Sequence, residues 1–219
     1  MSSDGEHELT EPWEVDYRLP RHQQPLHYQI HLHPDLETGL FTGKVDIFMK
    51  INQSKYYFIL HSKFLNITST KVCRGHTLEG GEELRLHKAF EYPPNEFYII
   101  QLKDEASAGE YTISLEFDGS LTREIVGFYR STYRNDKNEL RLNKRPVPAK
   151  CGHSNLKFLP LHRRPIASSK FEPTYARRAF PCMDEPCFKS TFTVSLVRPT
   201  DRYMAYSNMP QVVSLHPLP

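Results

Sequence analysis

The stretch KFEPTYARRAFPCMDEP, residues 170–186, contains the residue types of a site that binds charged groups. Glu172 precedes Pro173, and the residue before a proline is held in an extended conformation. A carboxylate fixed at the end of an extended segment suits the capture of a cation, such as the α-amino group of a peptide. The competing interpretation is a surface ion pair of Glu172 with Arg177 or Arg178. The residue types leave both interpretations open and favour the ion pair.

Two local turns are expected in this stretch. Thr174 is placed to cap a short turn through residues 175–177, because a threonine oxygen accepts a hydrogen bond from the backbone at such a position. Residues 184–186 are expected to turn into the next strand. Cys182 and Cys187 flank that turn, and we interpret them as a buried thiol or a chance pair rather than as metal ligands.

No catalytic motif accompanies this stretch. Zinc peptidases place two histidines and a glutamate on a helix as HExxH, and His7–Glu11 (HELTE) lacks the second histidine. His31 and His33 share a strand face and residues 151–153 read C-x-H, but no second pair has a fitting spacing. The nucleophile motif G-x-S-x-G and a glycine-rich phosphate loop are also absent. The sequence therefore predicts no catalytic residue and no metal ligand.

The composition is that of an ordinary folded domain. The 219 residues are 38% hydrophobic and 25% charged, with a net charge of +2, which predicts a packed core and no nucleic-acid partner. The acidic, polar first twenty residues and the lack of long apolar runs predict neither a signal peptide nor a transmembrane segment in this chain. Asn52 and Asn66 nevertheless stand in N-x-[ST] sequons, which are used in the secretory pathway, and both are glycosylation candidates.

Apolar and polar residues alternate along much of the chain. This alternation occurs at residues 27–33, 44–51 and 111–117. It places one face of a strand on a core and the other in water. Residues 56–60 (YYFIL) and 97–102 (FYIIQL) are continuous apolar runs, typical of strands buried on both faces, and residues 188–197 read as a further strand. The pattern predicts an all-β fold, an antiparallel β-sandwich or β-saddle.

Residues 142–165 depart from this pattern. They contain six lysines or arginines, four prolines and no acidic residue, which is typical of an exposed loop or an insertion. A nucleic-acid patch is the alternative, but no aromatic platform accompanies the charge.

The segment FEPTYARRAFPCMDEPCFKSTF, residues 171–192, resembles the M1 family of zinc aminopeptidases, whose members read QFEPT, ARRAFPCFDEP and FKATF. Further similar segments follow in the family's order: YRLP, PLHYQIHLHPDL, FTGKVDI, ILHSKFLNI, GFYRSTYR and YSNMP. The resemblance covers most of residues 13–210, and it is nearest to the membrane-bound and endoplasmic-reticulum branch with leucyl-cystinyl and antigen-trimming aminopeptidases. It implies a saddle-shaped N-terminal β-domain beside a thermolysin-like catalytic domain.

The resemblance assigns a role to two residues. Glu172 matches the family glutamate that holds the substrate's α-amino group. Lys170 stands where glutamine is usual, and its ammonium would repel that of the substrate. The zinc helix and the GAMEN exopeptidase loop belong to the family's second domain, and neither motif occurs in this sequence. Zinc is thus expected in the full-length family enzyme, with no cofactor in this chain, which by itself is expected to be inactive.

The expected organisation is a polar tail (1–12), the β-domain (13–210) with residues 142–165 inserted, and an atypical tail (211–219). The resemblance implies a truncated form of a metalloaminopeptidase, incomplete at the C-terminus. Its implied partners are a peptide substrate and the missing catalytic domain or a full-length aminopeptidase. The implied location of the full-length protein is membrane-bound, in the endoplasmic-reticulum lumen or outside the cell. The alternative function is a non-catalytic β-sandwich module for binding or regulation.

Overall fold

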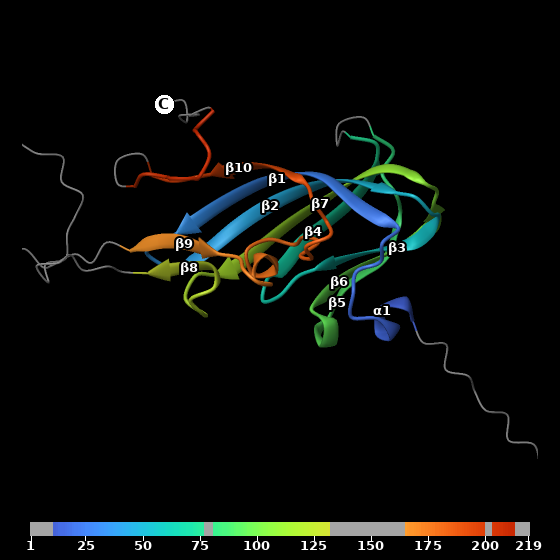
Figure 1. Cartoon of the computed structure of the whole chain (residues 1–219), viewed down its shortest axis with the longest axis horizontal. Coiled ribbons are helices and arrows are strands. Elements are labelled where there is room, and N and C mark those ends of the chain that lie inside the picture. Colours follow the sequence, from blue (N-terminus) through green and yellow to red (C-terminus); the bar gives the residue numbers. More distant parts are fainter. Residues whose placement is uncertain (1–10, 77–80, 132–164, 200–202, 213–219) are drawn as a thin grey trace, which may run out of the picture.

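The computed structural model describes residues 11–76, 81–131, 165–199 and 203–212 (Figure 1). Its strands are β1 (Gln23–Asp35), β2 (Leu40–Ile51), β3 (Lys55–His61), β4 (Asn66–Arg74), β5 (Leu86–Tyr92), β6 (Phe97–Ala106), β7 (Gly109–Ser120), β8 (Gly127–Ser131), β9 (Ile166–Lys170) and β10 (Thr191–Leu196). Its helical elements are α1 (Pro12–Val15), η1 (Pro93–Asn95) and η2 (Ala176–Arg178). The predicted all-β fold is confirmed.

The larger sheet has the strand order β10–β1–β2–β7–β4. Its middle strands show the predicted alternation, since Tyr28, Ile30 and Leu32 are buried and their neighbours along β1 are partly exposed. Strands β1, β2, β7 and β4 pair antiparallel, as predicted. Strand β10 instead pairs with β1 in parallel, so the antiparallel prediction is wrong at this edge. Parallel neighbours need a long crossover connection, and the chain from β1 to β10 provides one.

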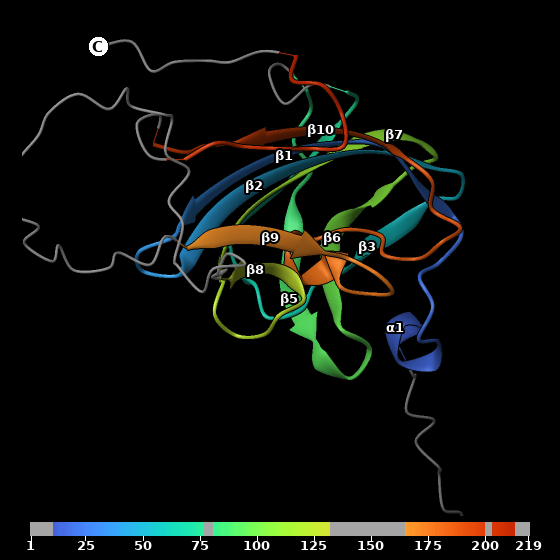
Figure 2. The ribbon, with the colours of Figure 1, turned by 60° about the vertical axis from the view of Figure 1, so that its left-hand side comes forward.

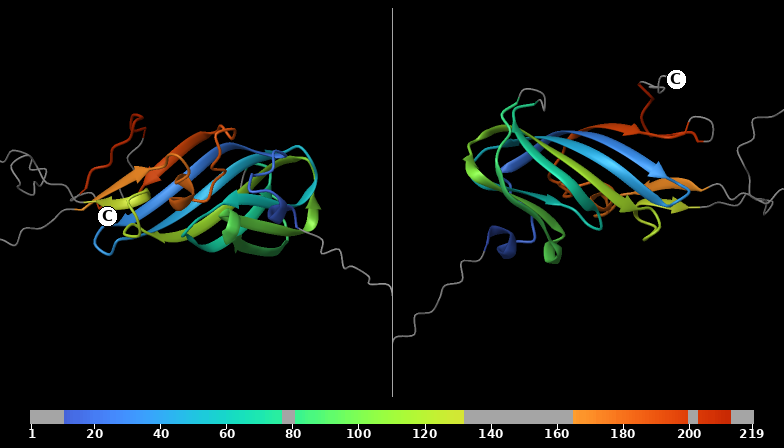
Figure 3. Two further views of the ribbon diagram at one scale, coloured as in Figure 1. Left: turned by 60° about the horizontal axis from the view of Figure 1, so that its bottom comes forward. Right: turned by 180° about the vertical axis from the view of Figure 1, so that it is seen from behind.

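A second sheet, β3–β6–β5, crosses beside the larger one, and together they form a curved saddle (Figures 2 and 3). Residues 58–60 of β3 and 97–100 of β6 are buried at every position, as their continuous apolar runs predict. The prediction is wrong at Tyr56, which is exposed at the start of the first run. They belong to one core cluster with the inner face of the larger sheet, for example with Ile47 and Ile113. Burial of this apolar surface is the main term that stabilises the fold.

Three positions on the polar face of the larger sheet are not in water, namely Asp46, Thr112 and Ser114, so the predicted alternation is wrong there. Asp46 is 5% exposed, although the alternation predicts a solvated side chain. Ser114 lies opposite it in the register, and the Ser114 hydroxyl donates to Asp46 Oδ1 at 2.6 Å. Lys44 Nζ lies 3.4 Å from the other carboxylate oxygen. A buried carboxylate needs such partners, and strand register, which the alternation does not reveal, provides them.

Strands β8 and β9 form a separate antiparallel pair beside the larger sheet (Figure 1). The segment that follows β9 leads through η2 to β10 and contacts both larger sheets on the way. The predicted insertion, residues 142–165, falls between β8 and β9 and, except for Pro165, lies outside the described residues. Residues 1–10 and 213–219 of the two predicted tails also lie outside them.

Candidate substrate-anchoring site

Strands β8 and β9 place the two predicted substrate-binding residues at the end of a strand pair. Lys170, the last residue of β9, lies opposite Gly127 of β8, and Glu172 follows two residues later. Gly127 has a φ of +74°, and a Cβ at this position would lie 2.8 Å from the Cβ of Arg178. Glycine is therefore required here, because a side chain would force the strand pair away from the segment after it.

The Glu172 carboxylate is exposed to solvent. Within the described ranges it has no hydrogen-bond or ion-pair partner. The favoured prediction of an ion pair with Arg177 or Arg178 is wrong, because both guanidinium groups pair with other carboxylates. Lys170 is exposed as well. Glu172 is thus an unpaired anion next to a cation, at the end of a strand.

Arg177 is the centre of a buried ion network in the same segment. Its Nε lies 3.0 Å from Asp184 Oδ2, and its Nη2 donates to the Asp184 backbone carbonyl at 3.1 Å. Its Nη1 lies 3.0 Å from Glu96 Oε2, and Glu96 also pairs with Lys63. Burial opposes ionisation of Glu96, but Lys63 and Arg177 outweigh it and lower its pKa. This network fixes η2 against the turn after η1.

His61 fixes the segment on its other side. His61 and Cys182 exchange two backbone hydrogen bonds, of 2.8 and 3.1 Å, as an isolated antiparallel bridge. The ring Nδ1 accepts the backbone N–H of Asp184 at 3.2 Å. Burial, and then the charge of Arg177, lower the pKa of His61 to about 3. His61 is therefore a neutral, structural histidine.

Tyr28 of β1 adds a third attachment. Its hydroxyl accepts the backbone N–H of Met183 at 3.1 Å, and burial raises the pKa of this phenol. Cys182 is buried and free, as predicted, and Cys187 is exposed and free.

The predicted cap at Thr174 is wrong. Helix η2 begins one residue later, with Tyr175 at the N-cap position and no side-chain capping bond. The turn is closed by the backbone instead, since the Tyr175 N–H donates to the Phe171 carbonyl at 2.7 Å. Phe171 also packs edge-on against Phe180, with ring centroids 6.0 Å apart. These contacts hold the chain on both sides of Glu172.

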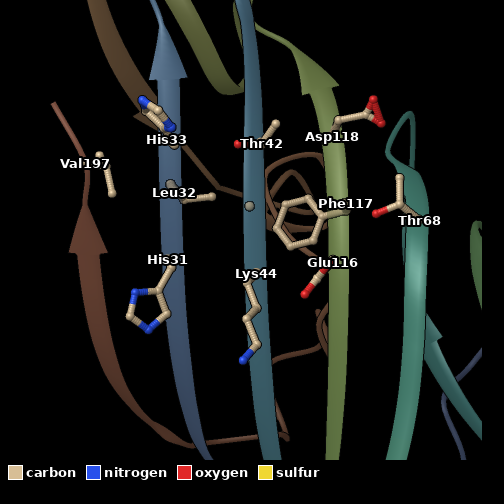
Figure 4. A pocket seen from close by; sticks show the side chains of 11 residues that line it. His31, Leu32, His33, Thr42, Lys44, Thr68, Glu116, Phe117, Asp118 and Val197 are labelled. Carbon is tan, nitrogen blue, oxygen red and sulfur yellow. The ribbon is translucent and has the colours of Figure 1, made fainter.

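A hollow of the described surface lies elsewhere, over β1, β2, β7 and β4 (Figure 4). It measures about 500 Å³ and is lined in part by His31, His33, Lys44 and Glu116. His31 and His33 project from the same strand, as predicted, but no group of three or more metal-binding side chains occurs in the described part of the chain.

The two glycosylation candidates differ in their surroundings. Asn52 is exposed in the turn between β2 and β3. Asn66 begins β4, and its side-chain amide donates to Asp118 Oδ2 at 2.7 Å. Both stay predictions.

Sequence reasoning missed the residues that hold the segment in place. These residues are His61 at the end of β3, Lys63 in the loop after it and Glu96 directly after η1. All three are far from residues 170–186 in the sequence. No periodic or motif signal marks them, because each is an isolated polar residue beside an apolar strand. Only His61 has a partial signal in the sequence, because it ends the apolar run of β3. A polar residue at the end of a buried strand needs a hydrogen-bond partner.

The comparison with protein families decides the affiliation. The Peptidase M1 N-terminal domain matches residues 24–142 and 161–216. The chain belongs to this family. Residues 143–160, which the match omits, fall inside the predicted insertion.

Similar proteins include glutamyl aminopeptidase of Bos taurus, 34% identical over 89% of this chain and 18% of that protein. Endoplasmic reticulum aminopeptidase 1 is 33% identical in Mus musculus, over 94% of this chain, and 33% in Homo sapiens, over 93%; each match spans 19% of the relative. The chain thus spans about a fifth of the length of these M1 relatives. Within the described residues, no helix is long and apolar enough to cross a membrane.

Proposed function

We propose that this M1 domain forms the wall of an aminopeptidase active site that binds the α-amino group of a peptide. Glu172 is the anchor, and the observation that carries the proposal is its exposed carboxylate, which has no partner among the residues that the structure describes. An ammonium group that binds there gains a charge-assisted hydrogen bond. It displaces no ion pair of the described part of the chain, so binding does not weaken the fold there.

Lys170 weakens the binding of an ammonium group at this anchor. Its ammonium is two residues from Glu172 and carries the same sign of charge as the group to be bound. Repulsion between like charges weakens substrate binding, more strongly at low ionic strength. The chain is therefore a weaker amine anchor than one with a neutral glutamine at this position.

Peptide hydrolysis belongs to the full-length family enzymes, in which zinc is expected. The described residues do not fit a zinc site, and the sequence contains neither HExxH nor GAMEN. The 219-residue chain is therefore expected to bind peptide without cleaving it. We place the full-length protein on a membrane, facing the endoplasmic-reticulum lumen or the cell exterior, which agrees with the exposed sequon at Asn52.

Peptide titration of the intact chain tests the anchor. A short peptide with a free amino terminus is compared with its N-acetylated form, by NMR chemical-shift changes or calorimetry. We expect binding of the free peptide to be about tenfold tighter, equivalent to one charge-assisted hydrogen bond. Glu172→Gln removes this preference, and Lys170→Gln increases it.

The matched control is Glu105→Gln, because Glu105 is exposed on β6, away from β9. This variant keeps the preference. Equal binding of free and acetylated peptides by the unaltered chain would refute the anchor. Zinc-dependent hydrolysis of an aminoacyl amide that survives repurification would refute the expected inactivity.

A further inference from the structure

Phe64 has an unusual backbone and an unusual position for an aromatic residue. It lies in the loop between β3 and β4, with a φ of 61° and 42% of its surface exposed. Bulky side chains seldom adopt the left-handed region, because the Cβ crowds the backbone. A strained residue that also exposes an apolar ring suggests a role outside the core.

Three cations gather around this ring. Arg123 Cζ lies 4.5 Å from the ring centroid, Lys63 Nζ 5.1 Å and Arg178 Cζ 5.3 Å. Arg178 also lies 4.8 Å from the centroid of the Tyr175 ring. We call these five residues the Phe64 cluster. Cation–π attraction keeps the three charges close together despite their mutual repulsion.

The charges of the cluster are not fully balanced. Lys63 pairs with Glu96, and Arg178 pairs with Glu124. Arg123 is exposed, and within the described ranges it makes no hydrogen bond and no ion pair. The buried Nε of Arg178 also lacks an acceptor there. The cluster thus presents one free guanidinium group over an aromatic ring.

The cluster and the amine anchor occupy the same end of the β8–β9 pair. Gly127 lies opposite Lys170 and packs against Arg178 and Tyr175. The segment after β9 carries Glu172 and, further along the chain, Tyr175 and Arg178 of the Phe64 cluster. A peptide whose amino group meets Glu172 has its remaining residues close to this loop.

We propose that the Phe64 cluster is a binding site for a carboxylate of the bound peptide, with Arg123 as its principal ligand. A guanidinium group has paired N–H donors that match a carboxylate, and the ring on its face leaves these donors free. Glu96, Glu124 and Glu172 nearby would repel a polyanion, so a single carboxylate fits better than a nucleic acid. This inference rests on the proposed peptide-binding function.

Four matched peptides test the site on the intact chain. Tetrapeptide amides carry glutamate or glutamine at positions two and three, each with a free or an acetylated amino terminus. At low salt we expect the glutamate peptides to bind about tenfold more tightly than the glutamine peptides. Arg123→Gln abolishes this difference, and Phe64→Leu reduces it.

The control variant is Arg85→Gln, because Arg85 is exposed and paired with Asp104 at a distant edge. It retains the difference. Equal binding of glutamate and glutamine peptides, or a difference that survives in Arg123→Gln, would overturn the proposal. Circular dichroism establishes that each variant is folded.

The acetylated pair separates the two hypotheses. If acetylation has no effect while the glutamate preference persists, the cluster is supported and the Glu172 anchor fails. If acetylation weakens binding while glutamate and glutamine peptides bind equally, the anchor is supported and the cluster fails.

Discussion

The segment from β9 to Phe188 has two halves with opposite character. From Lys170 to Thr174 the side chains are exposed, and Glu172 has no partner in the described structure. From Arg177 to Met183 nearly every side chain is buried. The second half is attached to three other parts of the fold by an ion network, a β-bridge and a tyrosine hydroxyl.

This difference separates the proposed amine anchor from the residues that stabilise the fold. An ion network around a buried guanidinium is costly to break, because removal of Arg177 leaves Asp184 without its ion-pair partner and Glu96 with Lys63 alone. An exposed carboxylate is already hydrated, so its replacement changes the stability little. We call Arg177 to Met183 the fixed half and Lys170 to Thr174 the free half. The fixed half holds the backbone of the free half in place and leaves the Glu172 carboxylate available to a ligand.

The largest expected effect is on the fixed half. Arg177→Met leaves Glu96 and Asp184 without their common partner, and we expect the free energy of unfolding to fall by about 3 kcal/mol or more. Urea denaturation measures it. The control, Arg85→Met, removes an exposed pair and should cost less than about 1 kcal/mol. Equal effects of the two variants would contradict the contrast between the halves.

Acid should destabilise the fixed half through His61. Its pKa is about 3 in the folded protein and ordinarily about 6.5, so the unfolded chain takes up the proton first as the pH falls. The stability from the neutral ring is complete above about pH 6.5 and declines toward pH 3, by roughly 2 kcal/mol at pH 5. The lowered pKa of Glu96 adds a loss in the same direction at lower pH.

The variant His61→Asn isolates this contribution. Asparagine provides an acceptor for the Asp184 N–H but does not titrate. Denaturation at a series of pH values and fixed salt measures how the free energy of unfolding depends on pH. Between pH 6.5 and 5 we expect a shallower slope for the variant, because its unfolding takes up about one proton fewer. An unchanged slope would show that His61 does not drive the acid sensitivity.

A smaller effect is expected where the two halves meet. In Gly127→Ala, the new Cβ lies 2.8 Å from Arg178 Cβ, on a backbone with a φ of +74°. We expect a loss of about 1 to 3 kcal/mol. The strained β8–β9 pair should also bind free-amine peptides more weakly. Gly75→Ala is the control, because its φ is also positive but a Cβ there meets no atom within 4 Å.

The smallest effect on stability is expected in the free half. Glu172→Gln should change the free energy of unfolding by less than about 0.5 kcal/mol, because the carboxylate has no partner to lose. The same variant should abolish the preference for a free amino terminus. A large loss of stability would mean that Glu172 is part of the fixed half.

The sequence alone determined the class of the fold and the place of its strands. Alternation in β1, β2 and β7 and the continuous apolar runs in β3 and β6 follow from which faces contact the core. The residue types at 170–186 favoured an ion pair for Glu172, and only the resemblance to the M1 family made it a candidate amine anchor, a role that stays a prediction.

Only the tertiary structure decided how the charges are paired. It assigned Arg177 to Asp184 and Glu96 rather than to Glu172, and it buried Asp46 beside Ser114. It also made β10 a parallel neighbour of β1. Local pattern reports which face of a strand is apolar. Pairing depends instead on strand register and on loops that meet across long separations in the chain, and no local period encodes either of these.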